Sequence, residues 1–147
     1  MDKLIVNPPI YLASTEIDCW KCKSKMTAVA IIAPNIPEAE GEIGILSDVS
    51  LLPEYLVEEI QKLHPNYQLR YSNTSKDKYY ANTCPNCSVI TGDFYLHSEP
   101  GGAFFPMSDI ETKKIQVRKI ELPETMEIEA GYGVGLGDEI LKLGERI

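Results

Sequence analysis

Four cysteines in two C-x-x-C turns constrain this chain more than any other feature. They are Cys19 and Cys22 in the first turn and Cys84 and Cys87 in the second, and the chain has no other cysteine. Two intervening residues let a tight turn aim both sulfurs at one ion, at about 2.3 Å for Zn²⁺, but one turn supplies only half of a tetrahedral site. The pattern predicts one structural Zn²⁺ held by all four cysteines across a 61-residue separation.

The two turns resemble the knuckles of zinc-ribbon folds, in which two β-hairpins grip one zinc ion with their tips. The resemblance covers residues 19–25 and 84–91 and identifies no family for the whole chain. Ribbons commonly place glycine after the second cysteine of a knuckle, where a positive φ is convenient. Here Lys23 and Ser88 occupy those positions.

The four cysteines have three alternative interpretations: a disulfide pair, a redox-active C-x-x-C motif and a catalytic metal site. Residues 1–9 lack an apolar core of signal-peptide length, so we expect a reducing, cytoplasmic setting in which disulfides are rare. A thioredoxin-like motif would open a helix within a βαβ unit, and neither turn has that context. A catalytic zinc keeps one position for water, whereas four thiolates close the site.

Composition indicates one zinc-binding domain over residues 1–147. The chain is 44% hydrophobic and 24% charged, which is typical of a globular protein, and no apolar run is long enough to span a membrane. Its formal net charge is −8, and four thiolates with one Zn²⁺ add −2, which gives −10. This balance opposes binding to nucleic-acid phosphates and favours a basic protein partner.

The patterning predicts an α+β fold, mainly an antiparallel sheet with the ribbon-like site, one clear amphipathic helix and a short C-terminal helix. Residues 27–32 are apolar on both faces, which indicates a central strand. The helix is expected at residues 53–63, with Leu56, Ile60 and Leu63 on its buried stripe. Ser108 and Glu111 form a capping-box pattern that introduces only a short turn of helix. Further strands are expected near residues 42–46, 67–71, 79–82, 89–96, 115–122 and 126–130, followed by a glycine-rich connector or close-packed segment at 131–137 and a helix within 138–147.

The second unusual stretch, residues 92–106, is dense in aromatic, acidic and glycine residues. If it began as a strand, Asp93, His97 and Glu99 would share one face and could form an acid–base or metal cluster. The simpler interpretation is a strand and a glycine turn, after which Phe104 and Phe105 fill the core.

Three functions remain open from the sequence. The first is a small acidic, non-enzymatic interaction module for a basic protein, in the manner of an inhibitor or immunity protein; its acidic segment contains Glu38, Glu40, Glu42, Glu54, Glu58 and Glu59. The second is nucleic-acid binding by a patch over the metal, formed by Lys21, Lys23, Lys25, Lys76 and Lys78 with Trp20, Tyr79 and Tyr80 for stacking. The third, which the closed zinc site disfavours, is a metal-dependent hydrolase using Asp93, His97 and Glu99.

Overall fold

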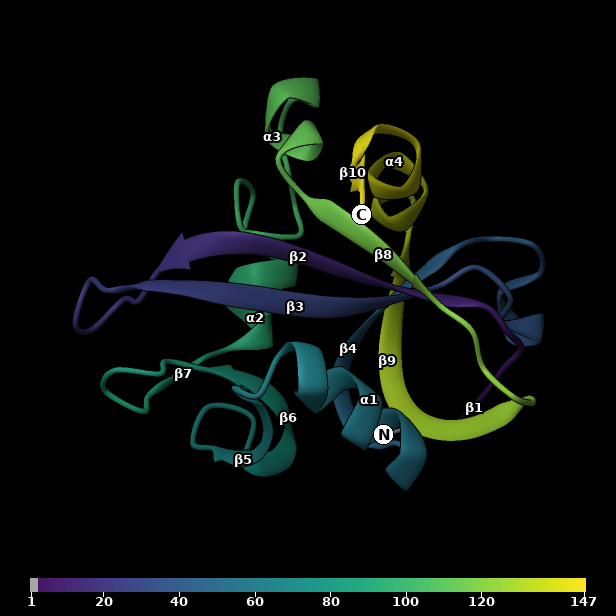
Figure 1. Ribbon diagram of the computed structural model, residues 1–147, viewed down its shortest axis with the longest axis horizontal. Helices are drawn as coiled ribbons and strands as arrows, with labels where there is room; N and C mark the ends of the chain where they lie inside the picture. The colour runs from purple at the N-terminus through teal and green to yellow at the C-terminus, as the bar shows by residue number, and fades with distance from the viewer. Residues whose placement is uncertain (1–2) are drawn as a thin grey trace.

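A computed structural model describes residues 3–147 as an α+β fold with two mostly antiparallel sheets (Figure 1). This confirms the fold class predicted from the sequence. The large sheet has the order β1-β9-β4-β3-β2-β8-β10, in which only the β8–β10 pair is parallel. Its strands are β1 (Lys3–Val6), β2 (Ile10–Asp18), β3 (Lys25–Ala33), β4 (Gly44–Leu51), β8 (Gln116–Ile120), β9 (Met126–Val134) and β10 (Glu145–Arg146). The small sheet has the order β5-β6-β7, with β5 (Tyr67–Ser72), β6 (Asp77–Thr83) and β7 (Ile90–Thr91).

Helices and loops cover both faces of the large sheet (Figure 1). The helical elements are the 3-10 turn η1 (Pro37–Ala39), α1 (Glu54–Leu63), α2 (Asp93–His97), α3 (Asp109–Lys113) and α4 (Leu136–Leu143). The predicted helix at residues 53–63 is α1, and Pro53 lies at its N-cap. Leu56 and Ile60 are buried as expected, but Leu63 is 40% exposed because it ends the helix beyond the core.

Strand β3 is the fourth of seven strands, as its apolar sequence predicted. Successive side chains of a strand point to opposite faces, so β3 contributes to two cores. Val29 and Ile31 pack in a core with α1 and η1, while Ala30 and Ile32 pack in a second core with α2, α4 and Phe104. Phe104 is fully buried and Phe105 is half-buried, so the expected core contribution is confirmed chiefly for Phe104.

One buried side chain joins the small sheet to the large one. The Asn82 amide of β6 accepts a hydrogen bond from Val29 N–H at 2.8 Å and donates to Val29 C=O at 3.1 Å. At the tip of the β2–β3 hairpin, Cys19 N–H donates to Ser24 C=O, and hydrogen-bonded and non-hydrogen-bonded pairs alternate along the two strands from there. The Ser14–Val29 pair is a non-hydrogen-bonded one, so the N–H and C=O of Val29 point away from β2. Asn82 therefore takes the place of a neighbouring strand at this point of β3.

The strand expected at residues 89–96 is wrong beyond its first residues. Strand β7 contains only Ile90–Thr91, and α2 follows at once. Gly92 is the N-cap of α2 and not a bulge. The helix is favoured because Asp93 lies at its N-terminal end and Leu96 faces the second core.

Three further boundaries differ from expectation. Strand β4 continues to Leu51, and β9 runs through most of the glycine-rich stretch to Val134. The stretch stays in a strand because it pairs with β4, with Gly131 opposite Ser47 and Gly133 opposite Ile45. The break comes only at Gly135, whose φ is 99°, and α4 begins at Leu136. The helix expected within 138–147 therefore starts earlier and is followed by β10.

Candidate metal centre

Each C-x-x-C turn lies at the tip of an antiparallel hairpin, as the ribbon resemblance implies. The first turn joins β2 to β3, and the second joins β6 to β7. In both turns the first cysteine donates its backbone N–H to the carbonyl five residues later at 2.8 Å, from Cys19 to Ser24 and from Cys84 to Val89. The two turns are thus local copies of one backbone structure.

The residue after each second cysteine closes its turn with a left-handed backbone. Lys23 has φ 66° and Ser88 has φ 69°, and their N–H groups donate to the carbonyls of Cys19 and Cys84 at 3.0 Å. These are the positions that ribbons commonly give to glycine. The knuckle geometry therefore forms here in spite of the strain that a side chain adds at positive φ.

The four sulfurs have the separations that one tetrahedral ion requires. Cys19 Sγ lies 3.6 Å from Cys87 Sγ, Cys22 Sγ lies 3.6 Å from Cys84 Sγ, and all four lie within 4.8 Å of one another. Ligands about 2.3 Å from zinc at tetrahedral angles are about 3.8 Å apart, whereas a disulfide needs about 2.05 Å. The cysteines are free thiols, and together they could form a zinc-binding site.

Burial and ligand type indicate a structural site. Cys19 and Cys84 are 0% and 1% exposed, and Cys22 and Cys87 are half-buried. Met26 packs beside them. Four thiolates would complete the coordination of an ion and leave no position for a reactive water.

Asn86, between the second pair of cysteines, supplies hydrogen bonds to sulfur in both knuckles. Its backbone N–H donates to Cys84 Sγ at 3.4 Å, and its side-chain Nδ2 donates to Cys22 Sγ at 3.4 Å. Nδ2 also lies 3.2 Å from Ser24 Oγ. Such donors hold the ligands in place and spread thiolate charge.

The same donors set the acidity of the thiols. Hydrogen bonds from the side chains of Asn86 and Ser24 lower the pKa of Cys22 to about 5. The Val89 N–H lowers the pKa of Cys87, but burial and the neighbouring sulfurs outweigh it and raise that pKa to about 11. Four thiols this close cannot all ionise without a cation, so metal binding would displace the last proton.

Outer contacts bind the knuckles to each other and to the small sheet. Trp20 Nε1 of the first knuckle donates to Ile90 C=O beside the second at 2.8 Å. Arg70 of β5 donates through Nη1 to Ser88 C=O at 3.0 Å. Sequence reasoning missed Asn86 and Arg70; the polar residue inside C-x-x-C was a usable signal for Asn86, whereas Arg70 is brought to the site only by the pairing of β5 with β6.

The cluster of Asp93, His97 and Glu99, which the sequence left open as an alternative, does not form a site. The Asp93 carboxylate is buried and accepts a hydrogen bond from Asp48 N–H at 2.7 Å, at a bulge of β4 where Asp48 has φ 50°. The His97 ring lies 5.3 Å from the Phe104 ring, and its buried Nδ1 lacks a hydrogen-bond partner among residues 3–147. Glu99 is exposed. Over the same residues, the four cysteines are the one group of three or more ligand-type side chains gathered closely enough for a metal.

The aromatic residues proposed for stacking near the metal are differently placed. Tyr79 is 3% exposed, and Tyr80 stacks on Tyr67 with ring centroids 5.8 Å apart. Trp20 is 59% exposed and remains accessible. Lys25 is paired with Asp18 at 2.8 Å, which leaves fewer unpaired cations over the knuckles than the sequence suggested.

Comparison of the chain with protein-family models, with curated proteins and with solved structures found no match. None of the helices within residues 3–147 has the length and apolar character needed to cross a membrane.

Proposed function

We propose that this protein is a non-enzymatic interaction module in which Zn²⁺ joins two hairpins and an acidic surface binds a basic protein partner. An inhibitor or immunity-type protein for such a partner would have this make-up. The four thiols suit a reducing compartment, where they stay available for the ion.

The uneven distribution of charge is the observation that supports this proposal. The zinc end, defined as residues 18–25 and 67–91, has six of the 14 basic residues and two of the 22 acidic ones. The remaining residues have eight basic and twenty acidic side chains, a net charge of −12. A field of this sign attracts a basic partner from a distance and accelerates encounter.

The acidic residues also lie where a partner can reach them. In Figure 1 the two knuckles lie at one end of the longest axis, while η1 and the β8–β9 turn lie at the other. Glu38 lies within η1, Glu40 is its C-cap, and Glu58 lies on α1. All three are exposed and form no ion pair within residues 3–147.

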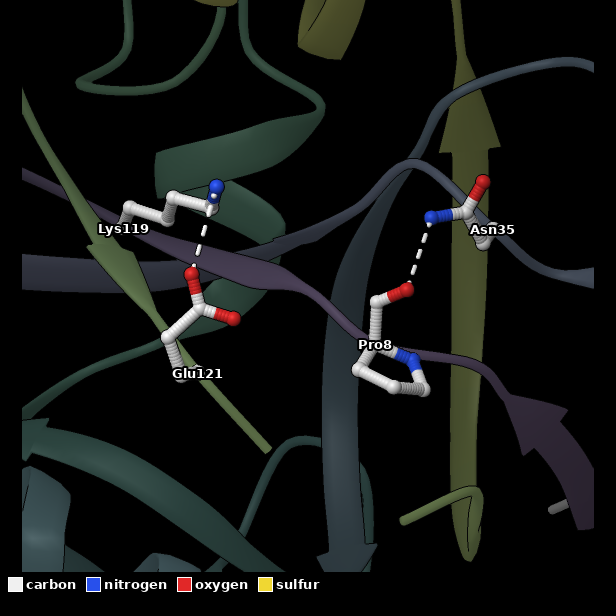
Figure 2. Close-up of polar contacts among 4 residues, drawn as sticks. All are labelled: Pro8, Asn35, Lys119 and Glu121. Atoms are coloured by element: carbon white, nitrogen blue, oxygen red, sulfur yellow. Dashed lines mark hydrogen bonds and ion pairs between the residues drawn. The ribbon is translucent and has the colours of Figure 1, made fainter. Parts of the chain in front are cut away.

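Where acids do have partners, the contacts are local and on the surface. In the β8–β9 region, Lys119 Nζ pairs with Glu121 at 3.2 Å (Figure 2). Figure 2 also shows Asn35 Nδ2 donating to Pro8 C=O at 3.1 Å, which fixes the loop before η1 against the start of β2. The ion pairs of the described residues therefore leave Glu38, Glu40 and Glu58 without a cationic partner.

Nucleic-acid binding at the zinc end is the second candidate. The supporting observation is the local net charge of +4, which falls to +2 when four thiolates hold a Zn²⁺. An exposed Trp20 adds a base-stacking surface. The much larger opposite charge on the rest of the chain ranks this candidate below a basic protein partner.

The test begins with affinity capture from the source cell, with nuclease treatment at two salt concentrations. Association of the captured partner is then measured with a variant carrying Glu38→Lys, Glu40→Lys, Glu58→Lys and Glu59→Lys. The association rate should fall by about tenfold or more and lose most of its salt dependence, because steering depends on the summed field. Thermal stability should change little, since exposed charges rarely shift it by more than about 0.5 kcal/mol.

A matched control reverses four exposed acidic residues elsewhere, so the net charge changes equally but the acidic segment is kept. These residues are Glu16, Glu99, Glu139 and Glu145. The control should retain more of the association rate than the first variant. Equal rates for both variants and the parent, or a partner that is lost on nuclease treatment, would refute the proposal.

A further inference from the structure

The outer edge of β5 is an open strand edge. Asn66 C=O accepts from Thr83 N–H, and the antiparallel register continues without a break to Ser72 opposite Asp77. Because hydrogen-bonded and non-hydrogen-bonded pairs alternate, Leu69 and Tyr71 direct their N–H and C=O groups away from β6. Within residues 3–147, no hydrogen bond occupies these four groups, whereas Tyr67 at the start of the strand bonds to His64 C=O and Gln61.

The side chains at this edge are apolar and accessible. Leu69 is 47% exposed and Tyr71 is 52% exposed, and they lie on the same face of β5 because strand side chains alternate. Figure 1 places β5 at the periphery of the molecule, on the side away from the large sheet. Unpaired backbone groups and exposed apolar side chains therefore lie together at Leu69 and Tyr71, on the outer edge of β5.

Natural proteins usually protect such an edge with proline, a bulge, or a lysine. Strand β5 has none of these over Tyr67–Ser72. Its one charged residue, Arg70, is turned to Ser88 C=O at 3.0 Å and Thr83 Oγ1 at 3.4 Å, so it supports the zinc knuckle and does not shield the edge. An unprotected edge is the feature by which sheets accept an additional strand from another polypeptide.

The local charge indicates what kind of strand fits. The β5–β6 hairpin contains Arg70, Lys76 and Lys78 against the single acid Asp77, and Lys78 lies directly opposite Tyr71. A second copy of this chain is disfavoured, because each copy has a net charge of −8 and the two would repel. Because directly opposite residues share a face, Lys78 lies on the face of Leu69 and Tyr71. A segment with apolar side chains towards Leu69 and Tyr71, and with acidic residues at the end near the β5–β6 turn, complements both the apolar face and the lysines.

We propose that the outer edge of β5, at Leu69 and Tyr71, binds an extended acidic segment of a partner protein as an added β-strand. Backbone hydrogen bonds to these two residues supply the pairing, Leu69 and Tyr71 receive the apolar side chains, and Lys76 and Lys78 receive the carboxylates. This site has the opposite charge to the acidic surface and is separate from it, so either can fail without the other.

The test uses a displayed library of random dodecapeptides selected on the zinc-loaded protein, with a Tyr71→Pro variant as the counter-target. Proline removes one outward N–H and leaves the ladder to β6 intact, because position 71 does not bond to β6. Enriched peptides should carry apolar residues at alternate positions and Asp or Glu residues near one end, where the β5–β6 turn places Lys76 and Lys78. Their Kd should weaken by about tenfold for Tyr71→Pro and for the Lys76→Glu, Lys78→Glu double variant.

Hydrogen exchange provides the direct readout. The amides of Leu69 and Tyr71 should exchange quickly in the free protein and become protected when the peptide binds. An Ile110→Lys variant, which adds a lysine at a 71% exposed position on α3, should bind peptide like the parent. If Tyr71→Pro fails to fold, peptides N-methylated along one edge must lose affinity, while those methylated along the other edge must keep it.

Several results would overturn the proposal. They are no enrichment over the counter-target, enriched peptides without acidic residues, and binding that leaves the Leu69 and Tyr71 amides unprotected. Sedimentation showing a dimer of the parent that Tyr71→Pro dissociates would assign the edge to a second copy instead.

Discussion

Asp93 and His97 lie one helical turn apart on α2, and burial shifts their pKa values in opposite directions. Burial raises the pKa of Asp93 to about 7, against a partial offset from the Asp48 N–H bond. Burial lowers the pKa of His97 to about 4. The free energy of unfolding therefore falls as pH rises towards 7, because the buried Asp93 carboxyl group ionises. It also falls as pH decreases below 6.5, because His97 takes up a proton more readily in the unfolded chain.

Replacing Asp93 with Asn should isolate the contribution of Asp93, because His97 is present in both proteins. The variant should gain stability relative to the parent by on the order of 2 kcal/mol between about pH 5.5 and about pH 8, because only the parent ionises a buried carboxyl group. Urea unfolding across this range measures the difference. Glu99→Gln, at an exposed carboxylate of the same predicted trio, should show no such trend; a difference for Asp93→Asn that is constant with pH would contradict the assignment.

This trio also shows a limit of sequence reasoning at single residues. Side chains two residues apart share a face of a strand, so a strand would place Asp93, His97 and Glu99 together. In the structure Asp93–His97 is the helix α2. The burial of Asp93 depends on a distant backbone N–H at Asp48, 45 residues away, which no local pattern reveals. The close grouping of the four cysteines was predictable, because the spacing of the two cysteines within each turn is local and chemically specific.

Among the structural elements, the two knuckles are strained at the same point. Ser88 is a non-glycine residue with φ 69°, and a left-handed backbone costs an L-residue about 1–2 kcal/mol. Ser88→Gly should therefore raise the free energy of unfolding by about 0.5–1 kcal/mol, after allowing for the greater entropy of glycine in the unfolded chain. Its C=O remains to accept from Arg70.

Chemical denaturation of the metal-loaded protein would measure this gain. Ser98→Gly is the matched control, because Ser98 ends α2 with φ −113° and needs no glycine. That control should lose stability. A Ser88→Gly variant that is no more stable than the parent would show that the knuckle imposes no net strain there.

The elements that the sequence predicted well have strong local signals. Strand β3 is apolar on both faces, and α1 combines a proline start with a stripe at Leu56 and Ile60. The extension of β9 to Val134 was missed because glycines at 131, 133 and 135 suggest a connector. Gly131 and Gly133 are held in the strand by pairing with β4. Sheet order was equally beyond local reasoning, since β9 lies between β1 and β4.

At the scale of the whole molecule, the proposed zinc would link two sheets that also meet in a shared hydrophobic core, in which Tyr67 of β5 and Val29 of β3 are buried. Each sulfur pair at 3.6 Å joins one cysteine of the β2–β3 hairpin to one of the β6–β7 hairpin, and the Asn82 amide is a second link. Metal-binding energy at such a site is also folding energy.

Native mass spectrometry of the purified protein, compared with a Cys84→Ser variant, is the most direct test of this account. We expect the parent to carry one Zn²⁺ per chain, and the variant to lose the ion and unfold at a markedly lower temperature. A parent that has the mass of the metal-free chain under native conditions, or a Cys84→Ser variant that melts like the parent, would contradict the central claim that the four cysteines hold one structural zinc.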